Sequence, residues 1–354
     1  MIAGGATIAG CLAASAALGI ALPRAAGAGA AALSALVGVV SAILLLGVAA
    51  WLLIRATRRW GRLVLLPWIA IVLVAVYALS IAFAAVYPRH PQAGEVPSGA
   101  VPVSMTASDG VELAGWYLPT QNGAAVVLRH GAGSRTADAV LQARALHDEG
   151  YGVLATDARG HGASGGQGMD LGWYGEVDTR AAVDFLGSRA DVDPERIAVV
   201  GLSMGGEEAI GAAGVDERIC AVVAEGATGR TAADKAWLVE EYGVAGAVQS
   251  ALDVVTYGVI DMLTPAVPPA TLADSIDAAP DTSFLLIAAG EVRDEQLVAE
   301  RLEQIAPGRV SVWVAEGADH SQAIRSAPEQ WRSRVAGFLA SSLHVCESRP
   351  SSAA

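Results

Sequence analysis

Two long apolar runs near the amino terminus constrain the fold of this chain more than any other feature. Residues 31–54 and 63–87 contain no charged side chain, and each exceeds the roughly 20 apolar residues that a membrane-spanning helix needs. A third run, residues 2–22, is long enough but consists mostly of alanine and glycine. We therefore predict a transmembrane region and linker over residues 1–95, with spans at about 2–22, 31–54 and 63–87. A lipid bilayer is the expected partner of these spans.

Two other interpretations of the first run stay open. A cleaved secretory signal normally begins with basic residues, and residues 2–23 contain none. The stretch from Ile8 to Cys11 resembles a lipoprotein cleavage box, but it also lacks a basic start. The sequence therefore leaves open whether residues 2–22 are retained as a span.

The distribution of arginine predicts the orientation of the spans. The loop between the second and third runs holds a cluster of arginines, namely Arg55, Arg58, Arg59 and Arg62. The other flanking segments carry only Arg24 and Arg89. Because positively charged residues stay on the cytoplasmic side, the third span should run outward. We expect a multi-pass protein of the cell membrane whose remaining domain is extracytoplasmic.

Beyond the proline-rich stretch 88–97, the composition is that of an ordinary globular protein with an excess of acidic residues. The net charge of −13 comes from this part, because the first part carries only arginines. Nucleic-acid binding needs a basic surface, so we expect no nucleic-acid partner. The three cysteines, Cys11, Cys220 and Cys346, provide no disulfide framework, and we predict no structural disulfide. Residues 345–354 are predicted to be a disordered tail.

Apolar strands alternate with helical patterns through residues 96–344. The alternating stretch 101–118 predicts a β-hairpin, and later apolar runs at 124–131, 151–162, 196–200, 219–226, 283–290 and 309–315 predict buried strands. Helical spacing between them is clearest at 136–148 and 176–188. Strands and helices in this alternation form a mostly parallel, doubly wound α/β sheet, whose sites lie at the carboxyl ends of the strands.

The stretch "RIAVVGLSMGGEEAIGAA" combines a strand, a G-x-S-x-G motif and a helix. Such a turn holds its serine, here Ser203, in a strained conformation, and Gly201 and Gly205 remove side chains that would collide. The amide groups at the start of the helix favour negative charge near the serine. We therefore predict that Ser203 is a nucleophile. Glu207 and Glu208 are interpreted as residues that complement the helix dipole.

The motifs "RHGAGS", "DARGHGASGG", "GLSMGG" and "GADHS" together resemble the α/β-hydrolase superfamily over most of residues 101–341. More narrowly, the chain is similar to membrane-anchored or secreted esterases and peptidase-like hydrolases, whose domain opens with a hairpin like "DGVELAGWYLP". The resemblance implies an α/β-hydrolase fold after the transmembrane helices. It also implies a triad of serine, acid and histidine in that chain order.

The catalytic histidine implied by the resemblance is His320, which follows the last predicted strand. His130 and His161 lie in glycine-rich turns, where such hydrolases use histidine to brace loops. The acid should follow the strand 283–290, and we choose Asp294 with Glu291 as the alternative. The usual acid position is occupied by Arg293, so the sequence departs from the family pattern here.

For the oxyanion hole, the resemblance implies the backbone N–H groups of Met204 and Ala132. Asp157, Arg159, His161 and Ser164 are interpreted as a structural turn. No cluster has metal-ligand spacing, and no nucleotide-binding motif is present, so we expect neither a metal nor a cofactor.

The predicted function is hydrolysis of a carboxylic ester, thioester or amide, with a small-molecule, acyl or peptide substrate. An acyltransferase with the same residues and a catalytically silent scaffold at the membrane remain alternatives. An insertion at about 228–275 is interpreted as a lid or as a segment packed against the membrane. The natural substrate and the oligomeric state stay open.

Overall fold

A computed structural model describes the chain except for residues 26–28, 58–60, 91 and 348–354. The chain divides into two compact units. The first contains Met1–Arg89 together with Ala236–Pro265, and the second contains His90–Lys235 and the chain from Ala266 onward. Arg58, Arg59 and Trp60, and the predicted tail beyond Glu347, lie outside the described residues.

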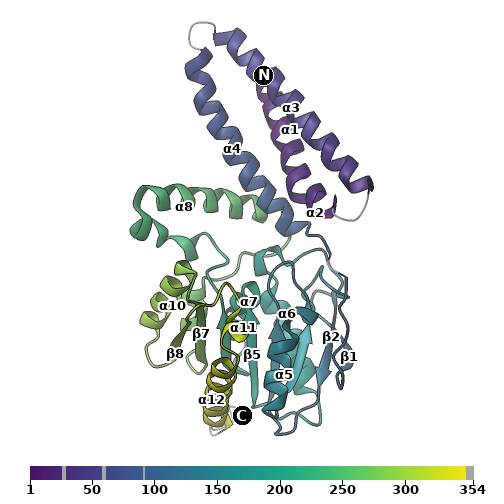
Figure 1. Ribbon diagram of the computed structural model, residues 1–354, viewed down its shortest axis with the longest axis vertical. Coiled ribbons are helices and arrows are strands. Elements are labelled where there is room, and N and C mark those ends of the chain that lie inside the picture. Colours follow the sequence, from purple (N-terminus) through teal and green to yellow (C-terminus); the bar gives the residue numbers. More distant parts are fainter. Residues whose placement is uncertain (26–28, 58–60, 91, 348–354) are drawn as a thin grey trace. The chain divides into compact units, whose positions relative to one another are not determined.

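The first unit is built from long apolar helices (Figure 1). The amino-terminal run forms α1 (Ile2–Ala16), a π-helical turn (Ala17–Ala21) and α2 (Leu22–Ala25). The next two runs form α3 (Gly29–Thr57) and α4 (Gly61–Val86). The guanidinium of Arg24 donates to the carbonyl oxygens of Tyr87 and Pro88, at 2.9 and 2.7 Å, and so joins the end of the first run to the end of α4.

The insertion supplies a further helix, α8 (Leu238–Leu263), which packs on α4 within the same unit. Within the predicted insertion, residues 228–275, the segment Ala236–Pro265 belongs to the first unit. Among the described residues, four segments are long and apolar enough to cross a membrane, namely Ile2–Ala25, Gly29–Thr57, Leu63–Val86 and Leu238–Leu263. The fourth was not predicted as a span.

The second unit contains an eight-stranded sheet in the order β1-β2-β4-β3-β5-β6-β7-β8. Its strands are β1 (Val101–Thr106), β2 (Glu112–Leu118), β3 (Ala125–Arg129), β4 (Gly152–Thr156), β5 (Ile197–Leu202), β6 (Ile219–Glu225), β7 (Ser283–Ala289) and β8 (Val310–Ala315). β2 pairs antiparallel with β1 and β4, and all other pairs are parallel. The predicted doubly wound α/β sheet is confirmed.

Helices cover both faces of this sheet (Figure 1). The longer ones are α5 (Val140–Asp148), α6 (Gly175–Gly187), α7 (Met204–Ala213), α9 (Leu272–Asp277), α10 (Arg293–Ile305) and α12 (Pro328–Glu347). The short elements are α11 (Ala323–Ser326) and single 3₁₀ turns at Thr136–Ala139, Asp170–Gly172 and Ala233–Lys235. α5 and α12 contact each other on one face, whereas α6 contacts α7 and α7 contacts α9 on the other.

The central strands are apolar along their whole length because both of their faces are covered. Every residue of β3, β4, β5 and β6 is buried. Alternate strand residues, such as Val126 and Leu128, join one core cluster with α5 and α12, which includes the fully buried Trp331. The carboxyl ends of the parallel strands thus lie along one edge of a rigid, closely packed sheet.

A disulfide joins Cys220 on β6 to Cys346 on α12, so the prediction of no structural disulfide is wrong. The two residues are 126 positions apart in the sequence, and only the packing of α12 on β6 brings them together. The predicted tail boundary is also too early, since α12 continues to Glu347. Cys346 is buried within that helix.

Candidate active site

Ser203 occupies a sharp turn between β5 and α7. Its backbone has φ 54° and ψ −123°, a left-handed conformation that is costly for a residue with a side chain. A Cβ atom on Gly205 would lie 2.6 Å from the carbonyl oxygens of Arg129 and His130, and one on Gly201 would collide with the backbone of Gly205. The turn therefore requires glycine on both sides of the serine, as the sequence motif indicates.

A chain of two hydrogen bonds connects Ser203 to a buried carboxylate. The Ser203 Oγ lies 2.8 Å from Nε2 of His320, and Nδ1 of the same ring lies 2.6 Å from Oε1 of Glu295. Ser203 follows β5, Glu295 is in the first turn of α10 after β7, and His320 follows β8. The structure thus brings together the predicted serine and histidine at one edge of the sheet.

The carboxylate bound to His320 belongs to Glu295, and not to the predicted Asp294 or to the alternative Glu291. The reason is the position at which α10 begins, since Glu295 shares the buried face of this helix with Val298 and Leu302. Glu291 is exposed and Asp294 is half-buried. Sequence reasoning missed Glu295, although the sequence contains a signal. Glu295, Val298 and Leu302 have the i, i+3 and i+7 spacing of one helix face, so Glu295 is an acidic residue on an otherwise apolar face.

Glu295 is held firmly in this position. Its side chain is 1% exposed, and its second oxygen, Oε2, accepts the backbone N–H of Ala289 at the end of β7, at 2.8 Å. The hydrogen bond with Glu295 raises the pKa of His320, and the charge of Glu295 adds to this effect while burial of the ring opposes it. The carboxylate therefore orients the ring and stabilises its protonated form.

Two histidines brace the loop after β3, which carries Ala132. His130 Nε2 accepts the N–H of Ala158 at 3.0 Å, so its Nδ1–H donates to the Gly131 carbonyl oxygen at 2.7 Å. His161 Nε2 accepts the N–H of Gly133 at 3.2 Å. Burial lowers the pKa of His130 to about 4 and also lowers the pKa of His161. Both rings are thus neutral at pH 7, and each acts as donor and acceptor at once.

The turn after β4 is structural, as the sequence suggests. Asp157 accepts the backbone N–H groups of Thr136 and Ala163. Ser164 donates to the Asp157 carbonyl oxygen at 2.6 Å. Arg159 forms ion pairs with Asp109 and Asp178. These bonds fix the loop that contains His161.

Glu207 and Glu208 lie near the start of α7, as predicted, and both are buried and hydrogen-bonded. Glu207 accepts the N–H groups of Thr228 and Gly229 after β6, at 2.9 and 2.8 Å. Glu208 accepts two hydrogen bonds from Arg129, at 2.9 and 2.6 Å. Burial raises the pKa of both carboxyl groups. The helix after the serine is therefore tied to two neighbouring strand ends.

Glu225, the last residue of β6, is a second residue that sequence reasoning missed. Its carbonyl oxygen accepts the N–H of Ser203 at 2.6 Å. Its carboxylate accepts the N–H of Ala323 at 2.9 Å and the indole N–H of Trp331 at 3.0 Å. The next residue, Gly226, has φ +76°, and a Cβ atom there would lie 3.0 Å from Cε1 of His320. One strand end thus positions both the serine and the histidine loop.

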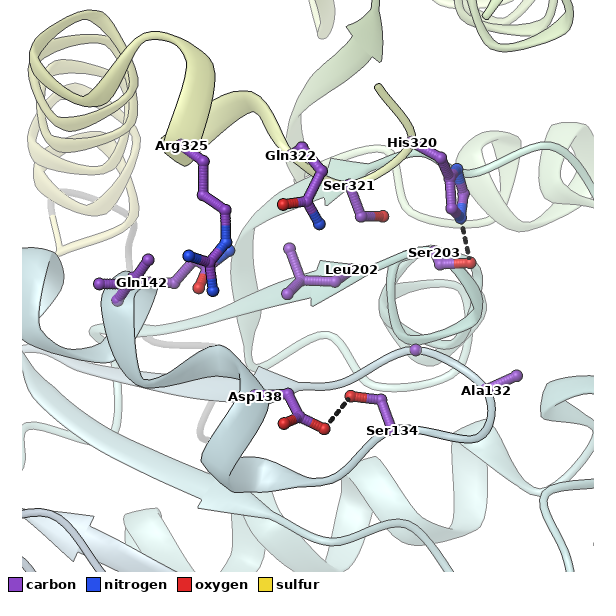
Figure 2. Close-up of a pocket in the computed structure, with 12 residues that line it drawn as sticks. Ala132, Ser134, Asp138, Gln142, Leu202, Ser203, His320, Ser321, Gln322 and Arg325 are labelled. Atoms are coloured by element: carbon purple, nitrogen blue, oxygen red, sulfur yellow. Dashed lines mark hydrogen bonds between the residues drawn. The ribbon is translucent and has the colours of Figure 1, made fainter. Parts of the chain in front are cut away.

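A pocket of about 300 Å³ opens beside Ser203 (Figure 2). Its walls come from the loop after β3, the end of β5 and the segment after β8. Polar side chains predominate in the lining, including Asp138, Gln142, Gln322 and Arg325. Asp138 accepts a hydrogen bond from Ser134 within it. In the part of the chain that the structure describes, no group of three or more His, Cys, Asp or Glu residues is arranged to hold a metal ion.

Comparisons with known proteins agree with this architecture. The family model described as serine aminopeptidase, S33, matches residues 120–257. A protein of Mycobacterium tuberculosis is 41% identical over 133 residues, which cover 35% of this chain and 46% of the relative. A polyketide transferase of a Penicillium species is 32% identical over 132 residues, covering 34% and 43% respectively. The chain therefore spans about half the length of the curated relatives it matches, or less.

A solved structure extends the similarity to most of the chain. An esterase of Pyrococcus furiosus superposes with a TM-score of 0.56 and 26% sequence identity, over 73% of this chain and 98% of the esterase. The sheet order, the turn at Ser203 and these similarities all agree. The chain has the α/β-hydrolase fold, and its family match and this solved structure are those of α/β-hydrolase enzymes.

Proposed function

We propose that the protein is a serine hydrolase that cleaves a carboxylic ester, thioester or amide through an acyl-enzyme on Ser203. The observation that carries the proposal is the 2.8 Å contact between the Ser203 Oγ and Nε2 of His320, with Glu295 at the other ring nitrogen. A serine is a weak nucleophile on its own and needs such a base, oriented by a third group.

In the proposed mechanism, the Ser203 oxygen attacks the substrate carbonyl carbon while Nε2 of His320 takes the hydroxyl proton. Glu295 keeps the proton of the neutral ring on Nδ1, so that Nε2 is free to accept. His320 then gives its proton to the leaving group. Water, deprotonated by the same ring, releases the acyl group and regenerates Ser203.

The negative charge that develops on the carbonyl oxygen needs preorganised donors. We assign this role to the backbone N–H groups of Met204 and Ala132. Met204 is the first residue of α7, where helix N–H groups lack partners within the helix. Ala132 belongs to the loop braced by His130 and His161. The neutral state of these two histidines keeps that loop in place at physiological pH.

The first experiment is labelling of membranes that contain the protein with a fluorophosphonate probe. The parent should be labelled covalently, and Ser203→Ala should lose labelling completely because the attacking oxygen is gone. Turnover of a short-chain p-nitrophenyl ester should fall in parallel. A folded parent that is neither labelled nor active would favour the silent-scaffold alternative.

An acyltransferase remains the alternative activity, because the same residues would serve if an alcohol replaced water in the second step. The similarity to a polyketide transferase supports this alternative. Adding a series of alcohols to the ester assay separates the two. Hydrolysis predicts release of free acid at the same rate, whereas a transferase would form the new ester in preference.

The pH dependence of kcat/KM should report the ionisation of His320. Since the base must be neutral, activity is expected to fall as the pH drops through the pKa of His320, which Glu295 raises above its ordinary value. His130 keeps its neutral form down to a pH of about 4, so it should not contribute to this limb. If the acidic limb of the pH profile of kcat/KM lay well below pH 6, it would contradict the assignment of His320 as a base paired with Glu295.

Replacing Glu225 by glutamine should lower kcat/KM about tenfold, because an amide cannot accept both N–H donors and one buried donor loses its partner. The negative charge of Glu225 also raises the pKa of His320, so the acidic limb should move to lower pH. Trp331→Phe is the control, since it removes one donor but keeps the carboxylate. It should lower stability and leave the limb where it is.

We further propose that α1–α2, α3 and α4 cross the cell membrane. The second unit, formed by His90–Lys235 and the chain from Ala266 onward and called the hydrolase unit below, is then extracytoplasmic. Two observations support this orientation. Arg24 is hydrogen-bonded at the end of α4 that leads into the hydrolase unit. The cluster of arginines at residues 55–62 belongs to the loop before α4, and positively charged loops stay on the cytoplasmic side. The Cys220–Cys346 disulfide is typical of proteins in an oxidising compartment.

A further inference from the structure

The helix α8 has the length and apolar composition of a membrane span, but the sheet forbids it to be one. The last strand before α8 is β6, and the first strand after it is β7. These two strands pair in parallel, with Ala221 opposite Ser283. A helix that crossed a bilayer once would leave β6 and β7 on opposite sides, where no backbone ladder could join them.

The two ends of the insertion are also held together directly. Asp234, in the 3₁₀ turn before α8, accepts the backbone N–H of Leu272, the first residue of α9, at 2.7 Å. The return segment, residues 264–271, reads "TPAVPPAT" and is not helical. Non-helical backbone cannot pass through lipid, because its carbonyl groups would lack hydrogen-bond donors. The inserted segment therefore leaves the hydrolase unit and returns to it without crossing the bilayer.

The exposed face of α8 is nevertheless apolar. Val244, Val248, Val255 and Met262 recur at spacings of four and seven residues, and they are 83%, 57%, 42% and 85% exposed. The opposite face is more polar, with Asp253 and Thr256 buried and Gln249 donating to Asp253 at 3.0 Å. A helix surrounded by water has the reverse arrangement. The apolar face of α8 is thus suited to a non-aqueous neighbour.

The packing of α8 identifies that neighbour. α8 contacts α4, one of the proposed spans, and belongs to the same compact unit. In Figure 1, α8 runs across α4, whereas α3 runs more nearly lengthwise to it. A helix that lies across a spanning helix lies close to the plane of the bilayer. The segment 236–265 contains no lysine or arginine, so burial of apolar surface, and not attraction to anionic lipids, would hold it there.

We propose that α8 is an interfacial helix, whose face formed by Val244, Val248, Val255 and Met262 lies in the lipid just below the headgroups. This rests on the proposed membrane location of α4, but it does not depend on the proposed hydrolase activity. The hydrolase unit is then attached to the bilayer at two places, through α4 and through α8. Substrates dissolved in the lipid surface are thereby kept near the enzyme.

The test places a fluorescent bimane label on single cysteines in the full-length protein, reconstituted in phosphatidylcholine vesicles. The background is Cys11→Ser, and reductant is omitted to preserve the Cys220–Cys346 disulfide. For Val248→Cys and Val255→Cys, brominated phosphatidylcholine should cause a roughly twofold loss of fluorescence, since an interfacial helix buries its apolar face about 5–10 Å deep. Aqueous iodide should quench these labels weakly. Asp261→Cys, at an exposed acidic position of the same helical segment after Gly243, is the matched control and should show the opposite pattern.

A second measurement compares the two ends of the helix. Glu241→Cys and Asp261→Cys should both react with an impermeant maleimide from the same side of sealed, oriented vesicles, whereas a span would react at one end only. Quenching at Val248 by iodide would overturn the proposal, and so would protection from both quenchers, which would indicate a lid or a second protein copy. Fluorophosphonate labelling of each variant reports the hydrolase activity separately.

Discussion

Replacing Glu295 by glutamine is expected to lower kcat about 10³- to 10⁴-fold while leaving the fold intact. The amide can donate to Nδ1 of His320, which would place the ring proton on Nε2, the atom that must accept the Ser203 proton. The amide would also fail to stabilise the protonated ring. The measurement is kcat with a short-chain ester, together with the rate of fluorophosphonate labelling.

Asp294→Asn is the matched control, because it removes one carboxylate from the same turn of α10. We expect its kcat to stay within about twofold of the parent, because the carboxylate that binds His320 is that of Glu295. If Asp294→Asn lost activity and Glu295→Gln retained it, the acid would be the residue that the sequence pattern first suggested. The pair of variants therefore decides between the two assignments.

Arg129→Met is expected to lower the free energy of unfolding by about 3–5 kcal/mol, since it leaves a buried carboxylate without its partner. Arg129 is fully buried, donates twice to Glu208, and donates to Thr156 at 2.8 Å. Asp178 keeps its ion pair with Arg159, so Glu208 is the group left unpaired. Urea unfolding in detergent micelles, followed by tryptophan fluorescence, provides the measurement.

The control for this prediction is Arg332→Met. Arg332 pairs with Glu149 at 2.6 Å, but both side chains are well exposed, and solvent screens such pairs. The unfolding midpoint should stay unchanged. Equal shifts in the two variants would mean that the loss at position 129 comes from the shorter side chain and not from the buried charge.

The sequence predicts those parts of the site that depend on local backbone geometry. The turn at Ser203 needs glycine at two fixed positions, and this requirement is visible in a short motif. His320 follows an easily recognised strand. Glu295 escaped prediction because its role depends on the residue at which α10 begins, and a shift of one position turns a helical side chain by about 100°.

Contacts between distant segments were not predictable in the same way. Cys346 meets Cys220 only because α12 packs across β6, and no spacing in the sequence specifies that crossing. Glu225 is part of an apolar strand, and its partners are an amide and an indole about a hundred residues away. The role of α8 was left open between a lid and a membrane segment. The pairing of β6 with β7 supplies the constraint that its composition alone lacks.

The hydrogen bond between Trp331 and Glu225 makes the enzyme dependent on the completeness of its own chain. A product of premature termination that ends before Trp331 would contain Ser203, Glu295 and His320, yet Glu225 would lack its indole partner and the sheet would lack the cover of α12. Such a fragment would keep every reacting group and the bond from the Ala323 N–H to Glu225, but one of the two hydrogen bonds to the Glu225 carboxylate would be lost and the core beneath α12 would be open to water. We expect such a fragment to show no ester hydrolysis.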